Sequence, residues 1–288
     1  MTSGTASPSR DIHGKPGIGL TAHVVQGSEL RVASVHLEHN TLIFVDQGIK
    51  TVVTGAGATV DAAPGQAIVL RDHQTVDFRN ALTPLGRYEA RWLIFDPALL
   101  LDGAYQRDSE AARRRAKGRD APALAIARIG APFRASFEAA RAALAPANGV
   151  PDAIARLRML EVAYWLLEQG VALTPQAVPP STTAQVRHLV SREVQARWSS
   201  AEISGHLAMS EATLRRRLLA EGTSLTEVVA NVRMASALTL LQATSLPVAE
   251  VALSVGYESP SRFAVRFRKR FGFSPSAVRG SERAASHA

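Results

Sequence analysis

The chain of 288 residues contains no cysteine, which excludes disulfide bonds and thiolate metal sites. It has no apolar run of the roughly 18 residues that a membrane-spanning helix needs. The serine-nucleophile motif GxSxG, the Walker loop and the dinucleotide-binding motif GxGxxG are also missing. From these absences we expect a soluble, cytoplasmic protein that is not an enzyme, needs no cofactor and has no membrane partner.

Lysine is rare as well. It occurs at four positions, 15, 50, 117 and 269, so arginine supplies nearly all of the positive charge. The net charge is +8. From Ser181 onward, 14 Lys and Arg residues face 8 Glu and no Asp, so most of the excess positive charge lies in this segment. A basic segment favours a polyanionic partner without identifying it.

Composition predicts the division of the chain. The N-terminal residues lack the apolar core of a signal peptide and are typical of a disordered leader, and a Pro- and Thr-rich stretch is typical of a linker. The predicted parts are a leader over 1–29, a β-rich domain over 30–173, a linker over 174–183, a helical domain over 184–280 and a tail over 281–288.

Short β-branched and aromatic runs fill residues 30–96, separated by Gly, Pro, Asn and Asp. The five clearest are TLIFVD (41–46), TVVTG (51–55), QAIVL (66–70), TVDF (75–78) and YEARWLIFD (88–96). Such spacing predicts a small antiparallel barrel or sandwich.

Helices are expected after this β region. Asp96-Pro97 is typical of a helix start, and further helices are predicted at about 132–145 and 151–169, the latter with a broad apolar surface that either covers the β-domain or pairs with a second copy of the chain. The charged stretch at 107–120 is either a DNA-contacting arm or a solvated, mobile loop. We favour the loop, because acidic residues accompany the basic ones.

One supersecondary unit occurs twice near the C-terminus. The copies are AEISGHLAMSEATLRRRL (201–218) and AEVALSVGYESPSRFAVRF (249–267), and their apolar positions match when one residue is added to the second turn. Two short helices around a tight turn, with arginines on the second helix, are typical of a DNA-binding helix-turn-helix.

Capping residues predict where these helices begin and end. Ser199 with Glu202, and Ser224 with Glu227, fit the capping box. Further N-cap candidates are Ser210, Ser259 and Ser274, the last two followed by proline, and Gly222 and Gly272 follow the arginine-bearing helices as stop signals.

Each arginine-bearing helix is predicted to have an apolar stripe and a cationic face. The stripe comprises Leu214, Leu218 and Leu219 in the first helix and Phe263, Phe267 and Phe271 in the second. Residues 224–244 between the units predict one continuous helix of about 30 Å. One turn of B-DNA is about 34 Å long. The connector would therefore place the two arginine-bearing helices in successive major grooves.

These residues resemble the AraC/XylS family of bacterial transcription regulators. The segments that carry the resemblance are AEISGHLAMSEATLRRRLLAEG (201–222), VRMASALTLL (232–241) and PVAEVALSVGYESPSRFAVRFRKRFGFSPSAVR (247–279). The resemblance implies an α+β protein, in which a seven-helix domain with two helix-turn-helix units follows a cupin-like β-barrel domain with flanking helices.

Candidate DNA contacts follow from the helix faces and the resemblance. Arginine can bond guanine O6 and N7 in a bidentate manner. The candidates for base contact are Ala212, Arg215, Arg216, Ser261, Arg262, Val265 and Arg266. The candidates for phosphate contact are Ser210, Arg217, Ser259, Arg268, Lys269 and Arg270. Family members commonly carry arginine at the position of Val265 and a small residue at that of Arg266, so the cation is displaced by one position here.

The N-terminal half resembles the regulatory domain of the branch that contains virulence and stress regulators. That branch implies a fatty-acid-like effector or a protein partner. Candidates for holding an effector carboxylate are His36, His39, Lys50 and Arg91. We expect no metal site, because the HxH-plus-Glu ligand set of cupins is absent and His36 and His39 do not share a strand face.

Three hypotheses about function remain. The first, which we favour, is a sequence-specific regulator of promoter DNA that acts as an activator with RNA polymerase as partner, its N-terminal domain sensing an effector or forming a homodimer. The second makes the N-terminal barrel an enzyme or small-molecule binding module. The third is a ligand-independent regulator controlled by a protein partner.

Overall fold

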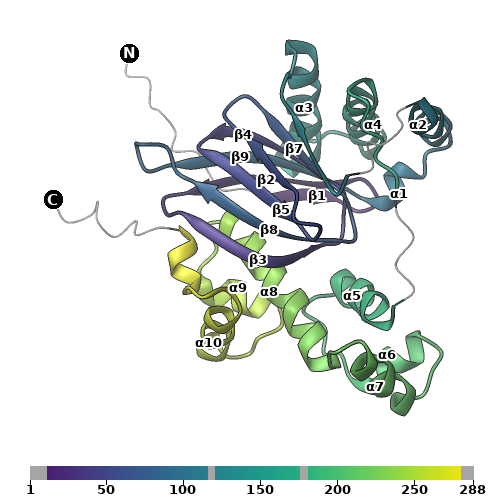
Figure 1. The fold of residues 1–288 in the computed structure, drawn as a ribbon, viewed down its shortest axis with the longest axis vertical. Coiled ribbons are helices and arrows are strands. Elements are labelled where there is room, and N and C mark those ends of the chain that lie inside the picture. Colours follow the sequence, from purple (N-terminus) through teal and green to yellow (C-terminus); the bar gives the residue numbers. More distant parts are fainter. Residues whose placement is uncertain (1–11, 116–120, 176–180, 280–288) are drawn as a thin grey trace. The chain divides into compact units, whose positions relative to one another are not determined.

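The chain divides into two compact units at Gln176 and Ala177, with residues 243–245 grouped with the first. The computed structural model describes residues 12–115, 121–175 and 181–279 (Figure 1). The first unit contains two antiparallel sheets with flanking helices and the second is helical, so the predicted α+β class is confirmed. The predicted tail over 281–288 and residues 176–180 of the predicted linker lie outside the described residues.

Two sheets form the centre of the first unit. The first has the order β1 (Ile12–Lys15), β2 (Gly19–Gln26), β9 (Tyr88–Phe95), β4 (Thr41–Gln47), β7 (Ala67–Leu70) and β10 (Ala123–Ile126). The second has the order β3 (Leu30–Leu37), β8 (Gln74–Ala81), β5 (Ile49–Thr54) and β6 (Thr59–Ala62). The five strands predicted between residues 41 and 96 are all present.

The six-stranded sheet has a buried core on each face. Ala90 and Trp92 of β9 pack with Val52 and Val76 of the other sheet. Leu93 and Phe95 of the same strand pack instead against the helices. Successive side chains of a strand point to opposite faces, which explains why the central strands contain unbroken apolar runs, residues 42–45 in β4 and 92–95 in β9.

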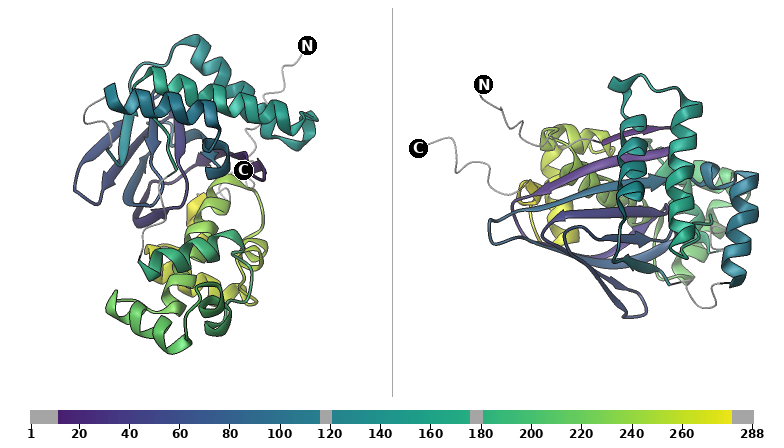
Figure 2. Two further views of the ribbon diagram at one scale, coloured as in Figure 1. Left: turned by 90° about the vertical axis from the view of Figure 1, so that its right-hand side faces the viewer. Right: turned by 90° about the horizontal axis from the view of Figure 1, so that it is seen from above.

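The helices of this unit are α1 (Pro97–Leu100), α2 (Gly103–Arg115), α3 (Ala131–Leu144) and α4 (Asp152–Glu168), with a short 3₁₀ turn at Pro146–Asn148. As predicted, Asp96 caps α1 by accepting a hydrogen bond from the Ala98 backbone N–H. Figure 2 shows α3 and α4 side by side across the outer face of the six-stranded sheet, and their buried side chains join its outer core. Covering the sheet is therefore one role of the apolar surface of α4.

The disordered leader predicted over 1–29 is wrong for residues 12–26. This segment forms β1 and β2, and β2 pairs with β9 over its whole length of eight residues. Ala22 and Val24 are buried between the sheets. The alternating apolar residues of a short strand were obscured by the polar leader before them, and residues 1–11 lie outside the described residues.

The mobile loop predicted at 107–120 is also wrong, over 107–115, which belong to α2. The Asp102 carboxylate accepts hydrogen bonds from the backbone N–H groups of Ala104 and Tyr105 and so starts the helix. Tyr105 is buried, and its hydroxyl accepts a hydrogen bond from the Leu173 backbone N–H. One aromatic anchor therefore outweighs the polar composition. Residues 116–120 lie outside the described part of the chain.

A lysine lies in the core between the two sheets. Lys50 of β5 is 1% exposed and donates a hydrogen bond of 3.0 Å from Nζ to the Asn80 amide oxygen, and Asn80 in turn donates to Gln26. The Lys50 ammonium also lies 3.9 Å from the centre of the Phe78 ring. No carboxylate is paired with it among the described residues, and burial lowers the pKa of Lys50 to about 7.

The pKa of Lys50 makes stability depend on pH. The unfolded chain binds the lysine proton with a pKa near 10.5, whereas the folded chain releases it near 7. Between these values the unfolded state binds more protons, so the free energy of unfolding rises with pH, by at most about 1.4 kcal/mol per pH unit. We expect this rise between pH 7 and pH 9.5 in urea unfolding of the full chain, followed by tryptophan fluorescence.

The Lys50→Met variant tests the origin of the rise. It keeps the volume and removes the titration, so its stability is expected to change less over the same pH range. Lys15→Met is the matched control, because Lys15 is only half-buried and its ammonium bonds the Asp152 carboxylate. An equal pH dependence in wild type and Lys50→Met would contradict the prediction.

Candidate nucleic-acid interface

The second unit contains α5 (Thr182–Arg192), α6 (Ser200–His206), α7 (Glu211–Ala220), α8 (Leu225–Ala243), α9 (Val248–Ser254), α10 (Pro260–Phe271) and a 3₁₀ turn at Pro275–Arg279. The predicted repeat corresponds to the pairs α6–α7 and α9–α10. The predicted continuous connector is α8, a single helix of 19 residues.

The predicted capping residues start the helices of the first pair. The Ser199 hydroxyl accepts from the Glu202 N–H, and the Glu202 carboxylate accepts from the Ser199 N–H, which completes a capping box. The Ser210 hydroxyl accepts from the Thr213 N–H at the start of α7. Ser224 similarly caps α8 through the Glu227 N–H. The turn between α6 and α7 places Ala208 at φ +50°, a conformation that a small residue tolerates best.

In the second pair, too, capping and turn residues set where the helices begin and end. The Ser259 hydroxyl caps α10 by accepting from the Arg262 N–H, and Pro260 occupies the first turn. Gly272 ends the helix in the left-handed conformation, at φ +83°. Gly256 in the turn has φ +80°, and a Cβ atom there would lie 2.7 Å from the Arg233 side chain, so the turn requires glycine.

The apolar stripes orient the two arginine-bearing helices. Leu214 and Leu218 of α7 are buried, as are Phe263 and Phe267 of α10. Leu219 was predicted to join the core of the first pair and does not, because 74% of it is exposed. A turn of about 100° per residue places Leu219 beside Ala212 and Arg215 instead of beside Leu214.

The proposed base-contacting residues all lie on the exposed faces of α7 and α10. Each is exposed in the structure: Ala212, Arg215, Arg216, Ser261, Arg262, Val265 and Arg266. Of the proposed phosphate-contacting residues, Ser210, Arg217, Arg268 and Lys269 are exposed and Ser259 and Arg270 are half-buried. The hydroxyls of Ser210 and Ser259 already serve as N-caps.

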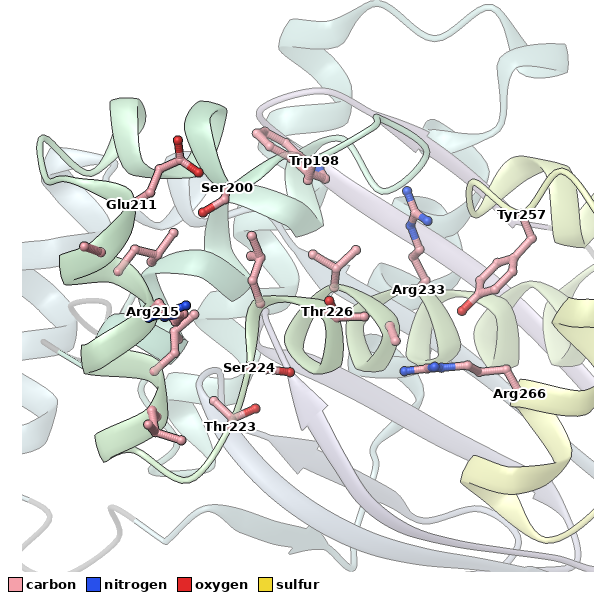
Figure 3. A pocket seen from close by; sticks show the side chains of 17 residues that line it. Trp198, Ser200, Glu211, Arg215, Thr223, Ser224, Thr226, Arg233, Tyr257 and Arg266 are labelled. Carbon is pink, nitrogen blue, oxygen red and sulfur yellow. The ribbon is translucent and has the colours of Figure 1, made fainter.

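A groove runs between the two arginine-bearing helices along α8. A cavity of about 1110 Å³ is lined by Arg215, Leu219 and Arg266, and an adjoining one of about 850 Å³ by Arg262 and Arg266. Figure 3 shows Arg215 on α7 and Arg266 on α10 at opposite ends of the groove, with α8 between them. The structure thus brings candidates for base contact from both arginine-bearing helices to one surface.

Arg233 of α8 lies at the middle of this groove and joins its two ends. Its guanidinium donates to the backbone oxygens of Val194 at 3.2 Å and Ala196 at 2.8 Å, both before α6, and of Gly256 at 3.1 Å, in the turn before α10. It also lies 5.8 Å from the centre of the Tyr257 ring. One side chain therefore connects both helix-turn-helix pairs to the connector helix.

The sequence analysis did not predict the role of Arg233 and wrongly placed Leu219 in the core, although the sequence indicates both positions. Arg233 follows Val229 by four residues and so lies near the apolar stripe of α8, where an unpaired charge is costly. Leu219 follows Ala212 by seven residues, which places both on one helix face. In each case the position of the residue around the helix axis predicts its surroundings better than its neighbours in the sequence do.

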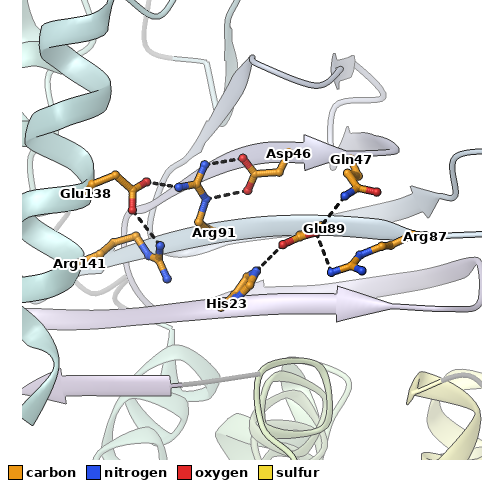
Figure 4. Close-up of polar contacts among 8 residues, drawn as sticks. All are labelled: His23, Asp46, Gln47, Arg87, Glu89, Arg91, Glu138 and Arg141. Atoms are coloured by element: carbon orange, nitrogen blue, oxygen red, sulfur yellow. Dashed lines mark hydrogen bonds and ion pairs between the residues drawn. The ribbon is translucent and has the colours of Figure 1, made fainter. Parts of the chain in front are cut away.

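The four candidates for an effector carboxylate do not converge on one site. Lys50 points into the core between the sheets together with Trp92. Arg91 is next to Trp92 in β9 and therefore points to the other face, where it pairs with Asp46 and Glu138 (Figure 4).

Arg91 belongs to a polar network beneath α3. Glu138 also accepts a hydrogen bond from Arg141 at 3.1 Å, and in the same region Glu89 is bonded by His23 at 2.8 Å (Figure 4). Two carboxylates already bind the Arg91 guanidinium, which removes it from the set of effector residues. The remaining two candidates, His36 and His39, lie on β3 and just after it.

Among the helices of the described residues, none combines the length and the apolar character needed to cross a membrane.

Comparison with known proteins agrees with this geometry. A family model for a helix-turn-helix domain matches residues 203–281, a range that begins within α6 and contains α7, α8, α9 and α10. The transcriptional regulator SirC of Salmonella typhimurium is 31% identical over 106 residues, which are 37% of this chain and 36% of SirC. The virulence regulon transcriptional activator VirF of Shigella flexneri is 30% identical over 95 residues, which are 33% of this chain and 36% of VirF. The chain thus matches little more than a third of the length of these relatives.

A solved structure extends the likeness to the β-rich unit at the level of the fold. ToxT from Vibrio cholerae covers 90% of this chain and 97% of its own, with a TM-score of 0.61 and 12% identity. At that identity the match supports the two-domain architecture alone. The repeated helix pairs, the helix-turn-helix family model and the two regulators agree: the C-terminal unit of this chain contains a helix-turn-helix domain that is similar to part of the transcription regulators SirC and VirF.

Proposed function

We propose that the chain is a sequence-specific transcription regulator that binds promoter DNA through α7 and α10. The observation that carries the proposal is the joint placement of two exposed arginine-bearing helices at the ends of one groove, fixed to one helix by Arg233. The similarity of SirC and VirF to this chain supports the same function. VirF is named as an activator, and we infer activation here, with RNA polymerase as a partner.

The length of α8 supports simultaneous binding by both helices. Nineteen helical residues span about 28 Å. Successive major grooves on one face of B-DNA are about 34 Å apart. A rigid helix of this length can hold α7 and α10 in neighbouring grooves, so one chain covers a site that single helix-turn-helix proteins cover as dimers.

The two binding helices offer different chemistry to DNA. On α7, Arg215 and Arg216 suit guanine, while Ala212 and Leu219 suit the methyl group of thymine. On α10, Val265 is 72% exposed and offers only an apolar contact. Arg266 lines both cavities, so we infer that it replaces the arginine that relatives carry one position earlier. Arg217, Arg268 and Lys269 are proposed to bind phosphates.

For the N-terminal unit we propose recognition of a carboxylate by Lys50. Its ammonium is buried without a carboxylate partner among the described residues, and the neighbouring Gln26 amide nitrogen lacks a hydrogen-bond partner there too. ToxT has been solved with an unsaturated fatty acid bound. The alternative is a regulator without a ligand, controlled by a protein partner; the exposed Ile154 and Leu157 of α4 offer an apolar contact for that partner or for a second copy of the chain.

If these arginines contact bases, replacing one of them is expected to reduce the specificity of DNA binding. Arg215→Ala and Arg262→Ala are each expected to cost roughly 1–3 kcal/mol on the preferred site and to relax the preference at one base position. The preferred site is first obtained by selection from random DNA, and Kd is then measured on that site and on single-base variants. Arg268→Ala is the control, expected to weaken preferred and random DNA equally. The same uniform loss for Arg215→Ala would reject its role in base contact.

When the Arg233 guanidinium is removed, we expect the fixed spacing between α7 and α10 to be lost. Arg233→Met keeps an unbranched side chain on α8 but frees the turn before α10 from the segment before α6. Binding to the preferred site is expected to weaken, while sites with one or two extra base pairs between the halves lose less affinity than in wild type. Arg197→Ala is the control. It removes an exposed ion pair with Glu258, which contributes about 1 kcal/mol or less, and the spacing preference is expected to remain that of wild type. An unchanged spacing preference in Arg233→Met would contradict this account.

A carboxylate site predicts that Lys50 decides ligand affinity. We expect the full chain to bind sodium oleate, and Lys50→Met to bind it roughly 10- to 100-fold more weakly, since a hydrogen-bonded charge is worth about 1.5–3 kcal/mol. Titration by calorimetry checks this, with Lys15→Met as control. If Lys50→Met binds oleate as tightly as Lys15→Met does, Lys50 is not part of the site. If wild type does not bind oleate, the protein-partner alternative is favoured.

A further inference from the structure

Three potential metal ligands meet at the end of the antiparallel pair formed by β3 and β8. They are His36, Glu38 and His73, and one donor atom from each lies within 4.8 Å of the others. All three residues are half-buried. Two imidazoles and one carboxylate form a ligand set that suits divalent transition ions and leaves coordination positions for water.

The strand register explains why these residues meet. His36 of β3 is opposite Thr75 of β8, and Leu37 is opposite Gln74 in the last pair of the ladder. Glu38 is the first residue after β3, and His73 is the last residue before β8. The three ligands therefore gather at the end of this ladder, with their donor atoms within 4.8 Å of one another.

The backbone around His73 is held firmly in place. The His73 N–H donates a hydrogen bond of 2.7 Å to the Leu37 backbone oxygen, which ties the segment before β8 to the end of β3. His73 has φ +53°, one of three non-glycine residues with positive φ among the described residues. Residues held in this sparsely populated region are concentrated at functional sites.

A neighbouring hydroxyl orients the first imidazole. His36 Nδ1 lies 3.1 Å from the Thr75 hydroxyl, and its Nε2 lies 3.8 Å from a Glu38 carboxylate oxygen. When Nδ1 bonds the hydroxyl as a donor, Nε2 presents its lone pair towards the carboxylate. Ring nitrogens of metal-binding histidines are commonly fixed by such a second hydrogen bond.

We propose that His36, Glu38 and His73 bind one divalent transition metal ion of the zinc type. The ion joins the end of β3 to the turn before β8 and so stabilises the four-stranded sheet. This inference does not depend on the proposed DNA binding. The expectation of no metal rested on the missing HxH-plus-Glu set and on the different strand faces of His36 and His39, whereas the structure brings His36 together with Glu38 and His73.

Metal binding is tested on full-length chain without an affinity tag, stripped with a chelator and titrated with Zn²⁺ by calorimetry. One ion per chain is expected, together with a rise in melting temperature, because an ion that binds only the folded state stabilises it. A second titration with Co²⁺ is expected to give the visible absorption of a bound ion. Binding is expected to be lost in His73→Gln and in Glu38→Gln.

Two further variants keep the test decisive if a ligand variant unfolds. Thr75→Val removes only the orienting hydroxyl and is expected to weaken Zn²⁺ binding roughly 10- to 100-fold. His23→Gln is the control, because His23 bonds Glu89 away from the cluster. Failure of wild type to bind one ion, or undiminished binding in both His73→Gln and Thr75→Val, would overturn the proposal.

Discussion

The geometry of the DNA-binding unit depends on the Arg233 guanidinium. The first helix-turn-helix pair shares a core with α8, in which Ile203 and Leu214 pack with Val228. Arg233 of α8 donates to the backbone oxygens of Val194 and Ala196, in the segment before α6, and of Gly256, in the turn of the second pair. It therefore holds both ends of the unit to α8 through main-chain atoms, which side-chain changes do not remove. Such charged hydrogen bonds are stronger than neutral ones. The requirement for glycine at 256 follows, because any Cβ atom there would displace the guanidinium.

The first unit depends on a sheet that is buried on both faces. The outer face receives α3 and α4, and the inner face receives the second sheet, so polar side chains on either face must find partners inside the protein. Arg91 on the outer face finds two carboxylates. Lys50 on the inner face bonds the Asn80 amide oxygen and lies over the Phe78 ring, with no carboxylate partner among the described residues, and its burial lowers its pKa to about 7. This contrast with Arg91 is the reason for proposing Lys50 as the residue that recognises an anion.

Much of the DNA-binding unit could be predicted because its signals are local. Ser199, Ser210 and Ser259 each cap a helix through the backbone N–H of the residue three positions later, and these contacts depend little on the rest of the fold. The features that were not predicted from the sequence depend on partners that are far away along the chain. Residues 12–26 become strands because β9 pairs with them, and α2 is anchored by Tyr105 through Leu173. The proposed metal ligands are brought together only by the register of β3 and β8.

The difference between the two arginine-bearing helices has a consequence for the proposed binding site. A dimer of identical helices has a palindromic site, because each half-site meets the same side chains. In this chain α7 offers Arg215 and Arg216, whereas α10 offers Val265 and Arg266, and the two faces favour different bases. The site of one chain is then asymmetric, and it can be occupied in one direction only. A regulator bound in a fixed direction presents the same surface to RNA polymerase at every promoter, which is what activation by contact requires.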